Sequence, residues 1–214
     1  MNFMFNLSGN NIPLIKEYEI DADTVIECGE VVGIKDDKVV KADEADKLLG
    51  VSAESHTGEK DILNVRSNGK KIRVIISPDA VYGVKSSEYT AISGTDTSII
   101  VPGDGLAVNV KSGYAVLVRK AENSVNTDSI GTKRRISDCA IAGENATITL
   151  EAGSASSEGD VYVIVPETGD EMQLDGNGTG VCFFRQGSNC KFTVVCNDTD
   201  YKTVYVKLNE TIFA

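Results

Sequence analysis

The sequence is poor in histidine and in aromatic residues. It contains no tryptophan and a single histidine among 214 residues, and only 6% of its residues are aromatic. That histidine, His56, lies in the polar stretch Ser55-His56-Thr57-Gly58 and has no second histidine with which to share a metal ion. Neither a nucleophile-elbow sequence nor a phosphate-cradling glycine loop opening into a helix occurs. We therefore expect no enzymatic activity, no catalytic or metal-binding residues and no cofactor, and His56 is predicted to be a loop residue.

Long apolar runs and an excess of positive charge are also missing. No segment approaches 18 consecutive apolar residues, and the first seven residues lack the basic and apolar regions of a secretory signal. The net charge is −11, of which −8 falls after Arg135. Because nucleic-acid binding needs clustered Lys and Arg, we expect neither nucleic acid nor membrane as a partner. The basic clusters Lys70-Lys71/Arg73 and Lys133–Arg135 are predicted to complement an acidic partner surface.

The five cysteines are an odd number in a chain without an export signal, which favours reduced thiols. Cys190 and Cys196 share one face of a predicted strand, so a zinc site or a disulfide that includes Cys182 is an alternative. Buried thiols are favoured because no C-x-x-C spacing and no histidine accompanies them. The hairpin register between Cys182 and Cys196 stays open.

Short runs rich in β-branched residues recur along the chain and are bounded by Gly, Asn, Asp and Ser, which indicates an all-β fold. The one helical signal is Asp43 to Leu49, where Asp43 is an N-cap and Gly50 follows the C-terminus. A helix this short is predicted to plug a barrel or sheet. The periodicity lapses from Glu122 to Arg135 and then resumes with about seven further strands. We therefore expect a small β-barrel-like domain at 17–121, a linker at 122–135 and an immunoglobulin-like β-sandwich at 136–214.

Residues 1–16 alternate apolar and polar side chains, and Pro13 bars a helix, so they are predicted to form an extended arm. An apolar arm of this kind can add a strand to the edge of a partner's sheet. The alternative is an ordinary edge strand of the chain's own domain. The candidate binding residues of the arm are Phe3, Phe5, Leu7, Ile12, Leu14 and Ile15.

Four segments, Cys28–Val32, Leu48–Ser52, Gly69–Ile76 and Gly113–Val118, occur in an order that resembles the capsid cement, or head decoration, proteins of tailed bacteriophages. The resemblance covers about residues 12–120, and the chain has Ser52-Ala53 where that family often has alanine. It implies an extended arm before a small β-rich domain, and no catalytic residue.

On this resemblance we expect a structural virion protein on the capsid exterior, assembled in the cytoplasm of a bacterial host. It would bind the major capsid protein through the arm and stabilise the shell, with the acidic sandwich facing outward. The sequence leaves monomer and trimer open. The alternative is an adhesin or tail-associated module whose outer domain binds a glycan or host surface, and a trimeric β-fold enzyme that uses His56 is a more distant third.

Overall fold

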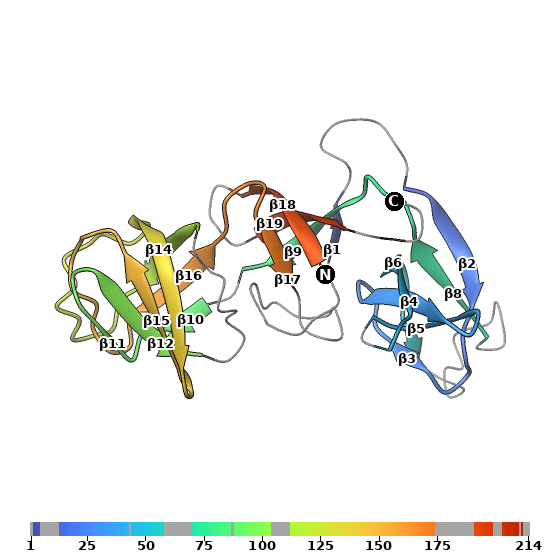
Figure 1. Ribbon diagram of the computed structural model, residues 1–214, viewed down its shortest axis with the longest axis horizontal. Helices are drawn as coiled ribbons and strands as arrows, with labels where there is room; N and C mark the ends of the chain where they lie inside the picture. The colour runs from blue at the N-terminus through green and yellow to red at the C-terminus, as the bar shows by residue number, and fades with distance from the viewer. Residues whose placement is uncertain are drawn as a thin grey trace.

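The expected all-β fold class is confirmed (Figure 1). The structure is a computed structural model that describes residues 2–4, 13–42, 44–57, 70–86, 88–103, 112–173, 191–198, 203–209 and 211. Every regular element within these ranges is a strand. None of the described residues lies in a helix long and apolar enough to cross a membrane.

The first unit is a small barrel. Its sheet has the order β2-β8-β6-β4-β5, with antiparallel neighbours: β2 (Ile15–Glu19), β8 (Lys71–Ile75), β6 (Lys47–Ser52), β4 (Val31–Lys35) and β5 (Lys38–Lys41). A bridge between Ile20 and Val39 joins the end of β2 to β5 and so closes the sheet. A two-stranded ribbon, β3 (Val25–Ile26) with β7 (His56–Thr57), lies beside it. Alternating side chains fill the interior: Ile20, Ile26, Val32, Val39, Leu49, Ile72, Val74 and Ile76.

The expected helix at Asp43–Leu49 is wrong over its described residues, 44–49; its predicted N-cap, Asp43, lies outside them. Glu44–Asp46 form a turn, and β6 begins at Lys47, so Leu48 and Leu49 are strand residues buried on opposite faces. Gly50 is a mid-strand residue rather than a helix terminator. A Cβ atom there would overlap the backbone carbonyl of Ile75 on β8. The helix-forming residue types are overridden because pairing with β4 and β8 buries more of the segment than one isolated helical turn could.

The second barrel lies at the opposite end of the molecule (Figure 1). Its order is β10-β16-β13-β14-β15-β12-β11, formed by β10 (Glu88–Thr90), β16 (Val161–Val165), β13 (Tyr114–Arg119), β14 (Lys133–Ala142), β15 (Asn145–Leu150), β12 (Ser98–Pro102) and β11 (Ser93–Gly94). The two outermost strands are neighbours in sequence: Thr90 pairs with Val161, and Ser93 pairs with Ile100. One bent segment therefore seals the sheet, and we call this unit the distal barrel.

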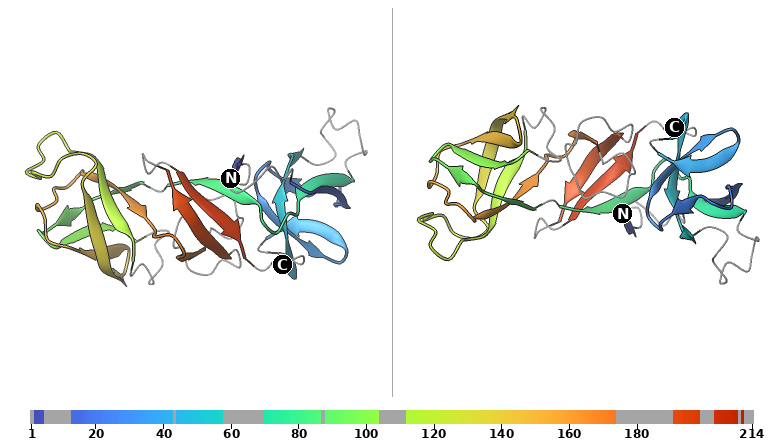
Figure 2. Two further views of the ribbon diagram at one scale, coloured as in Figure 1. Left: turned by 90° about the horizontal axis from the view of Figure 1, so that it is seen from above. Right: turned by 90° about the horizontal axis from the view of Figure 1, so that it is seen from below.

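A five-stranded central sheet separates the barrels (Figure 2). Its order is β1-β9-β19-β18-β17, formed by β1 (Asn2–Met4), β9 (Val81–Lys85), β19 (Thr203–Leu208), β18 (Lys191–Asn197) and β17 (Glu171–Gln173). The first barrel is inserted between β1 and β9, and the distal barrel between β9 and β17. Buried residues of all three units belong to one apolar cluster, including Ile75, Tyr82, Val206 and Leu117. After β19 the chain returns to the first barrel, where Thr211 bridges Leu48.

The structure divides the strands differently from the predicted domains. The expected linker 122–135 joins β13 to β14, which pair with each other in the distal barrel, so it does not separate two units. The strands expected to form a sandwich at 136–214 are also split. β14 to β16 lie in the distal barrel, whereas β17 to β19 lie in the central sheet. The boundary was misplaced because strand pairing here is long-range and leaves no local signal in the sequence.

Candidate functional site

The structure describes two parts of the predicted arm, residues 2–4 and 13–16, and they lie in different sheets. Residues 2–4 form β1, the outermost strand of the central sheet, antiparallel to β9. Over these three residues the edge-strand alternative holds, because the partner is the chain's own sheet. Phe5, Leu7 and Ile12 lie outside the described residues, and for Phe3 only the backbone is described.

Leu14 and Ile15 are held with their side chains exposed. The backbone N–H of Leu14 donates to Ser77 Oγ (2.6 Å), and its carbonyl accepts from the N–H of Ile76 (2.9 Å). Ile15 pairs with Ile75 at the start of β2. Nevertheless Leu14 is 52% and Ile15 43% exposed, among the few large apolar side chains of the described chain that remain in water. The two form a small apolar site on a backbone that is fixed on both sides.

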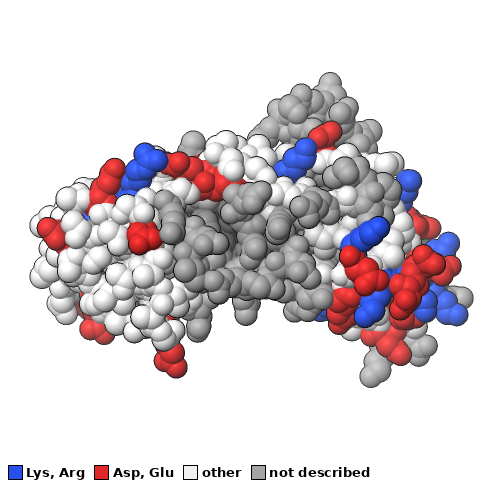
Figure 3. Space-filling model, in the orientation of Figure 1, with Lys and Arg blue, Asp and Glu red and all other residues white. Residues whose placement is uncertain are grey.

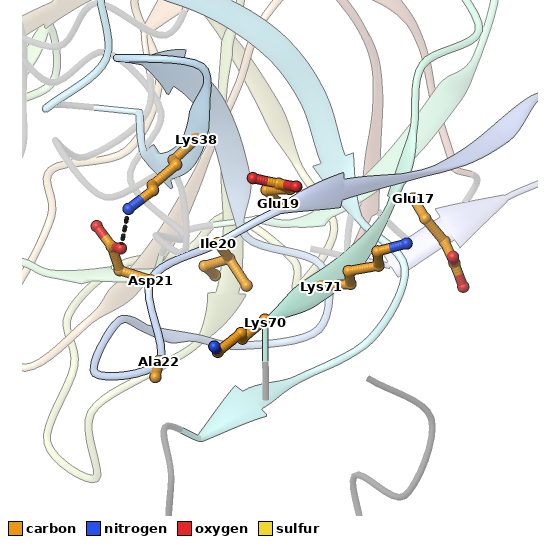
Figure 4. Close-up of a pocket in the computed structure, with 8 residues that line it drawn as sticks. All are labelled: Glu17, Glu19, Ile20, Asp21, Ala22, Lys38, Lys70 and Lys71. Atoms are coloured by element: carbon orange, nitrogen blue, oxygen red, sulfur yellow. Dashed lines mark hydrogen bonds and ion pairs between the residues drawn. The ribbon is translucent and has the colours of Figure 1, made fainter. Parts of the chain in front are cut away.

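Charged side chains crowd the first barrel, whereas the visible face of the distal barrel is largely uncharged (Figure 3). An open groove of about 570 Å³ lies on the first barrel, and both signs of charge line it (Figure 4). Lys38 forms an ion pair with Asp21 across its rim, and this hydrogen bond raises the pKa of Lys38. The lining residues are Glu17, Glu19, Ile20, Asp21, Ala22, Lys38, Lys70 and Lys71. Three lysines facing three carboxylates do not favour a ligand of either charge.

The first barrel also contains a buried carboxylate. The Glu30 side chain is fully buried; its Oε2 accepts the backbone N–H of Glu27 (2.9 Å) and its Oε1 lies 3.2 Å from Lys41 Nζ. Arg73 of the predicted basic cluster pairs with Glu54 of its own chain, with 2.7 Å between Nε and Oε2. These pairings stabilise the barrel.

The sequence predicted that His56 is a loop residue, and this prediction is wrong. His56 belongs to β7, opposite Ile26, and is 1% exposed. Its Nδ1 lies 2.5 Å from the backbone carbonyl oxygen of Thr24, so this nitrogen carries the proton and donates. The ring therefore links β7 to the turn before β3.

Three of the cysteines are described, and all three are free thiols. Cys139 is buried in the distal barrel, and burial raises its pKa; burial also raises the pKa of Cys196 on β18. Cys28 is exposed, and Cys182 and Cys190 lie outside the described residues. Within the described ranges no group of three or more His, Cys, Asp or Glu side chains could hold a metal ion.

A buried polar cluster lies in the distal barrel, and the sequence did not predict it. Asp160 is fully buried, and its carboxylate accepts the backbone N–H groups of Ala121 and Ser157, both at 3.0 Å. Asn126 Nδ2 donates to Asp160 (3.1 Å) and to the Tyr162 hydroxyl (2.9 Å). Burial opposes the charged form of Asp160, but hydrogen bonds from Ala121, Ser157 and their neighbours outweigh it and lower the pKa. The polar stretch predicted as a linker is therefore bound to a buried carboxylate.

Arg134 closes the same end of the barrel. It is 4% exposed although it belongs to a run of three basic residues. Its guanidinium donates to the backbone carbonyls of Glu151 (Nε, 3.0 Å), Ser154 (Nη1, 3.0 Å) and Asp96 (Nη2). Gly153 packs against the guanidinium so closely that a Cβ would lie 2.8 Å from Nε. Arg134 therefore does not contribute to the predicted surface for an acidic partner.

Comparison with known proteins assigns no relative. No protein-family model matches the chain, and neither a curated protein nor a solved structure matches it.

Proposed function

We propose that this chain is a structural virion protein that binds the outer surface of a tailed-phage capsid through its first barrel and stabilises the shell. The distal barrel then projects outward, in place of the sandwich expected from the sequence. The exposed Leu14–Ile15 site contacts the major capsid protein.

One observation carries the proposal. Three of the four segments that resemble head decoration proteins overlap three adjacent strands, β4, β6 and β8, of one closed barrel. These three segments therefore belong to a single folded unit. Gly50, in the resembling segment Leu48–Ser52, is required for a steric reason, because only glycine lets β6 approach Ile75 on β8. The fourth segment, Gly113–Val118, belongs to β13 in the distal barrel.

The apolar site suits weak contacts that are repeated over a shell. Burying two large apolar side chains is worth about 2 kcal/mol, which corresponds to roughly thirty-fold in affinity. A shell presents many equivalent sites, and a ligand that binds only the mature shell stabilises it by about 2.7 kcal/mol per site at 100 times Kd. A small contact repeated in this way is sufficient for a stabilising role.

The test is co-sedimentation of the full chain with expanded, undecorated shells, followed by imaging of the particles. Leu14→Asp and Ile15→Asp should each weaken binding about tenfold or more, because each places a charge in an apolar contact. Val125→Asp is the matched control, since Val125 is 73% exposed on the distal barrel. Thermal unfolding of each variant checks that the fold is retained. Unchanged shell binding by the Leu14 and Ile15 variants would contradict the assigned site, and no binding by the native chain would contradict the function.

A glycan- or host-surface-binding role for the distal barrel is the second candidate. The observation that favours it is the loop between β13 and β14, which hydrogen bonds attach to the barrel. The side chains of Val125 and Ile130 in this loop are 73% and 65% exposed. Rigid loops on a barrel are frequent recognition sites. Selective binding of the full chain to a glycan array, lost in Val125→Asp and retained in Leu14→Asp, would favour this role.

A further inference from the structure

The N-terminal strand is attached to the rest of the chain on one side only. β1 is a three-residue strand that pairs with β9 through Asn2–Gly83, Phe3–Tyr82 and Met4–Val81. Among the described strands β1 is the first in the order of the central sheet, so no described strand pairs with its other side. An open sheet edge is a template for pairing with another chain, and exchange of an identical element between copies is a low-cost route to dimers.

The edge that receives β1 is held in place without it. The opposite side of β9 pairs with β19 from Val81–Lys207 to Lys85–Thr203. Tyr82 and Val84 of β9 are each 2% exposed and belong to the apolar cluster that the three units share. If β1 leaves, β9 keeps its position and presents an ordered row of backbone donors and acceptors.

The connection from β1 to the first barrel is longer than the fold requires. Met4 pairs with Val81 and Ile15 pairs with Ile75, so residues 5–14 run between the same two units as residues 76–80. Ten residues thus connect β1 to β2, whereas five residues connect the neighbouring strands β8 and β9. A fully extended chain of ten residues spans about 33 Å, so the length of this connection allows β1 to reach a second molecule.

We propose that the outer edge of β9 is a self-association site that accepts β1 of a second copy of this chain. The occupant is defined by what already lies there: residues 2–4 pair with β9 within one chain, and the same residues can make the same ladder between chains. Exchange therefore needs no new surface. Each copy donates one strand and offers one edge, so two copies can close a reciprocal pair and several can form a ring. This association does not depend on the capsid.

The protein concentration determines whether β1 pairs with β9 of its own chain or with β9 of a second chain. Because a connection of only ten residues joins β1 to β2, β1 stays near its own β9 at an effective concentration on the order of millimolar. The native chain is therefore expected to be monomeric at micromolar concentration and to associate as its concentration approaches the millimolar range. Copies that crowd on a surface reach such a local concentration. The net charge of −11 makes copies repel, so added salt strengthens the association.

Disulfide trapping between two differently tagged full-length chains tests the exchange directly. One chain carries Met4→Cys and the other Val81→Cys, the pair that faces across the ladder, both in a Cys28→Ser background because Cys28 is exposed. Mixed near millimolar concentration and oxidised, they should form a 4–81 cross-link between chains, mapped by mass spectrometry. A single chain with both cysteines should form the same link internally at micromolar concentration.

Sedimentation equilibrium of the otherwise native chain supplies a second readout. Phe3→Pro removes a backbone N–H from β1 and should abolish association near millimolar concentration, whereas Phe3→Val should retain it. Absence of self-association in the native chain, or association that Phe3→Pro leaves unchanged, would overturn the proposal. So would a double-cysteine chain that closes internally while the mixed chains do not cross-link.

Discussion

Replacing Asp160 by asparagine tests whether a buried carboxylate holds the distal barrel together. The native carboxylate accepts two backbone N–H groups and the Asn126 amide and is fully buried. In Asp160→Asn the side chain keeps its shape, but one oxygen becomes an NH₂ group that meets donors rather than acceptors.

The expected loss of stability follows from these bonds. Hydrogen bonds to a charged group contribute about 1.5–3 kcal/mol each, neutral ones about 1 kcal/mol, and a buried donor left without a partner costs about 1–3 kcal/mol. Because the adjoining loop can partly re-hydrate, we expect Asp160→Asn to lower the free energy of unfolding by about 2–4 kcal/mol at neutral pH. Asp138→Asn is the matched control, because Asp138 is an exposed residue of β14 in the same barrel.

The pH dependence gives a sharper test. The folded state lowers the pKa of Asp160, so its contribution is present above the unfolded value of about 3.9 and is lost as pH falls through the folded pKa. Urea unfolding of native and variant chains at pH 7, and at steps down to about pH 2, should show the stability gap narrowing as Asp160 protonates. A gap that stays constant over this range, or a variant as stable as Asp138→Asn at neutral pH, would refute the assignment.

Three further substitutions test the first barrel and the closure of the distal one. Gly50→Ala should destabilise by about 2–3 kcal/mol in urea unfolding, because the new Cβ overlaps the Ile75 carbonyl and forces β6 from β8; a near-neutral result would contradict this strand approach. Lys41→Met leaves the buried Glu30 carboxylate without its cation and should cost about 2–3 kcal/mol, part of which the double variant with Glu30→Gln recovers; no recovery would contradict the pairing. In Arg134→Lys the ammonium group cannot reach three carbonyls at once, so the free energy of unfolding should fall by about 2 kcal/mol and amide exchange in the loop before β12 should become faster. Unchanged exchange would contradict the role of Arg134.

The local features of this fold were predictable because they depend on near neighbours in sequence. Alternation of apolar residues predicts strands such as β13, whose successive side chains point to opposite faces. Turn residues predict where strands end, and Gly113, at a φ of 90°, is one place where a turn needs glycine. The exception is Lys47–Leu49, where helix-forming residues lie in a strand because partners far away in sequence bury them.

The candidate sites were predictable only in part. Apolar alternation led to Leu14 and Ile15, which the structure leaves exposed, but it could not show that residues 2–4 pair with β9. Asp160 and Asn126 resemble ordinary turn residues in sequence. Nothing local distinguishes a solvated aspartate from one buried under a loop 34 residues away.

By itself the sequence determined that this is an all-β chain. It also determined where strands begin and turn, because those choices depend on side-chain alternation and on φ at a few glycines. Only the tertiary structure decided which strands pair, that two barrels are inserted into one central sheet, and that the polar stretch before β14 is part of a barrel rather than a linker. Strand pairing depends on contacts between residues distant in the chain, and these contacts form only when the whole apolar core is buried together.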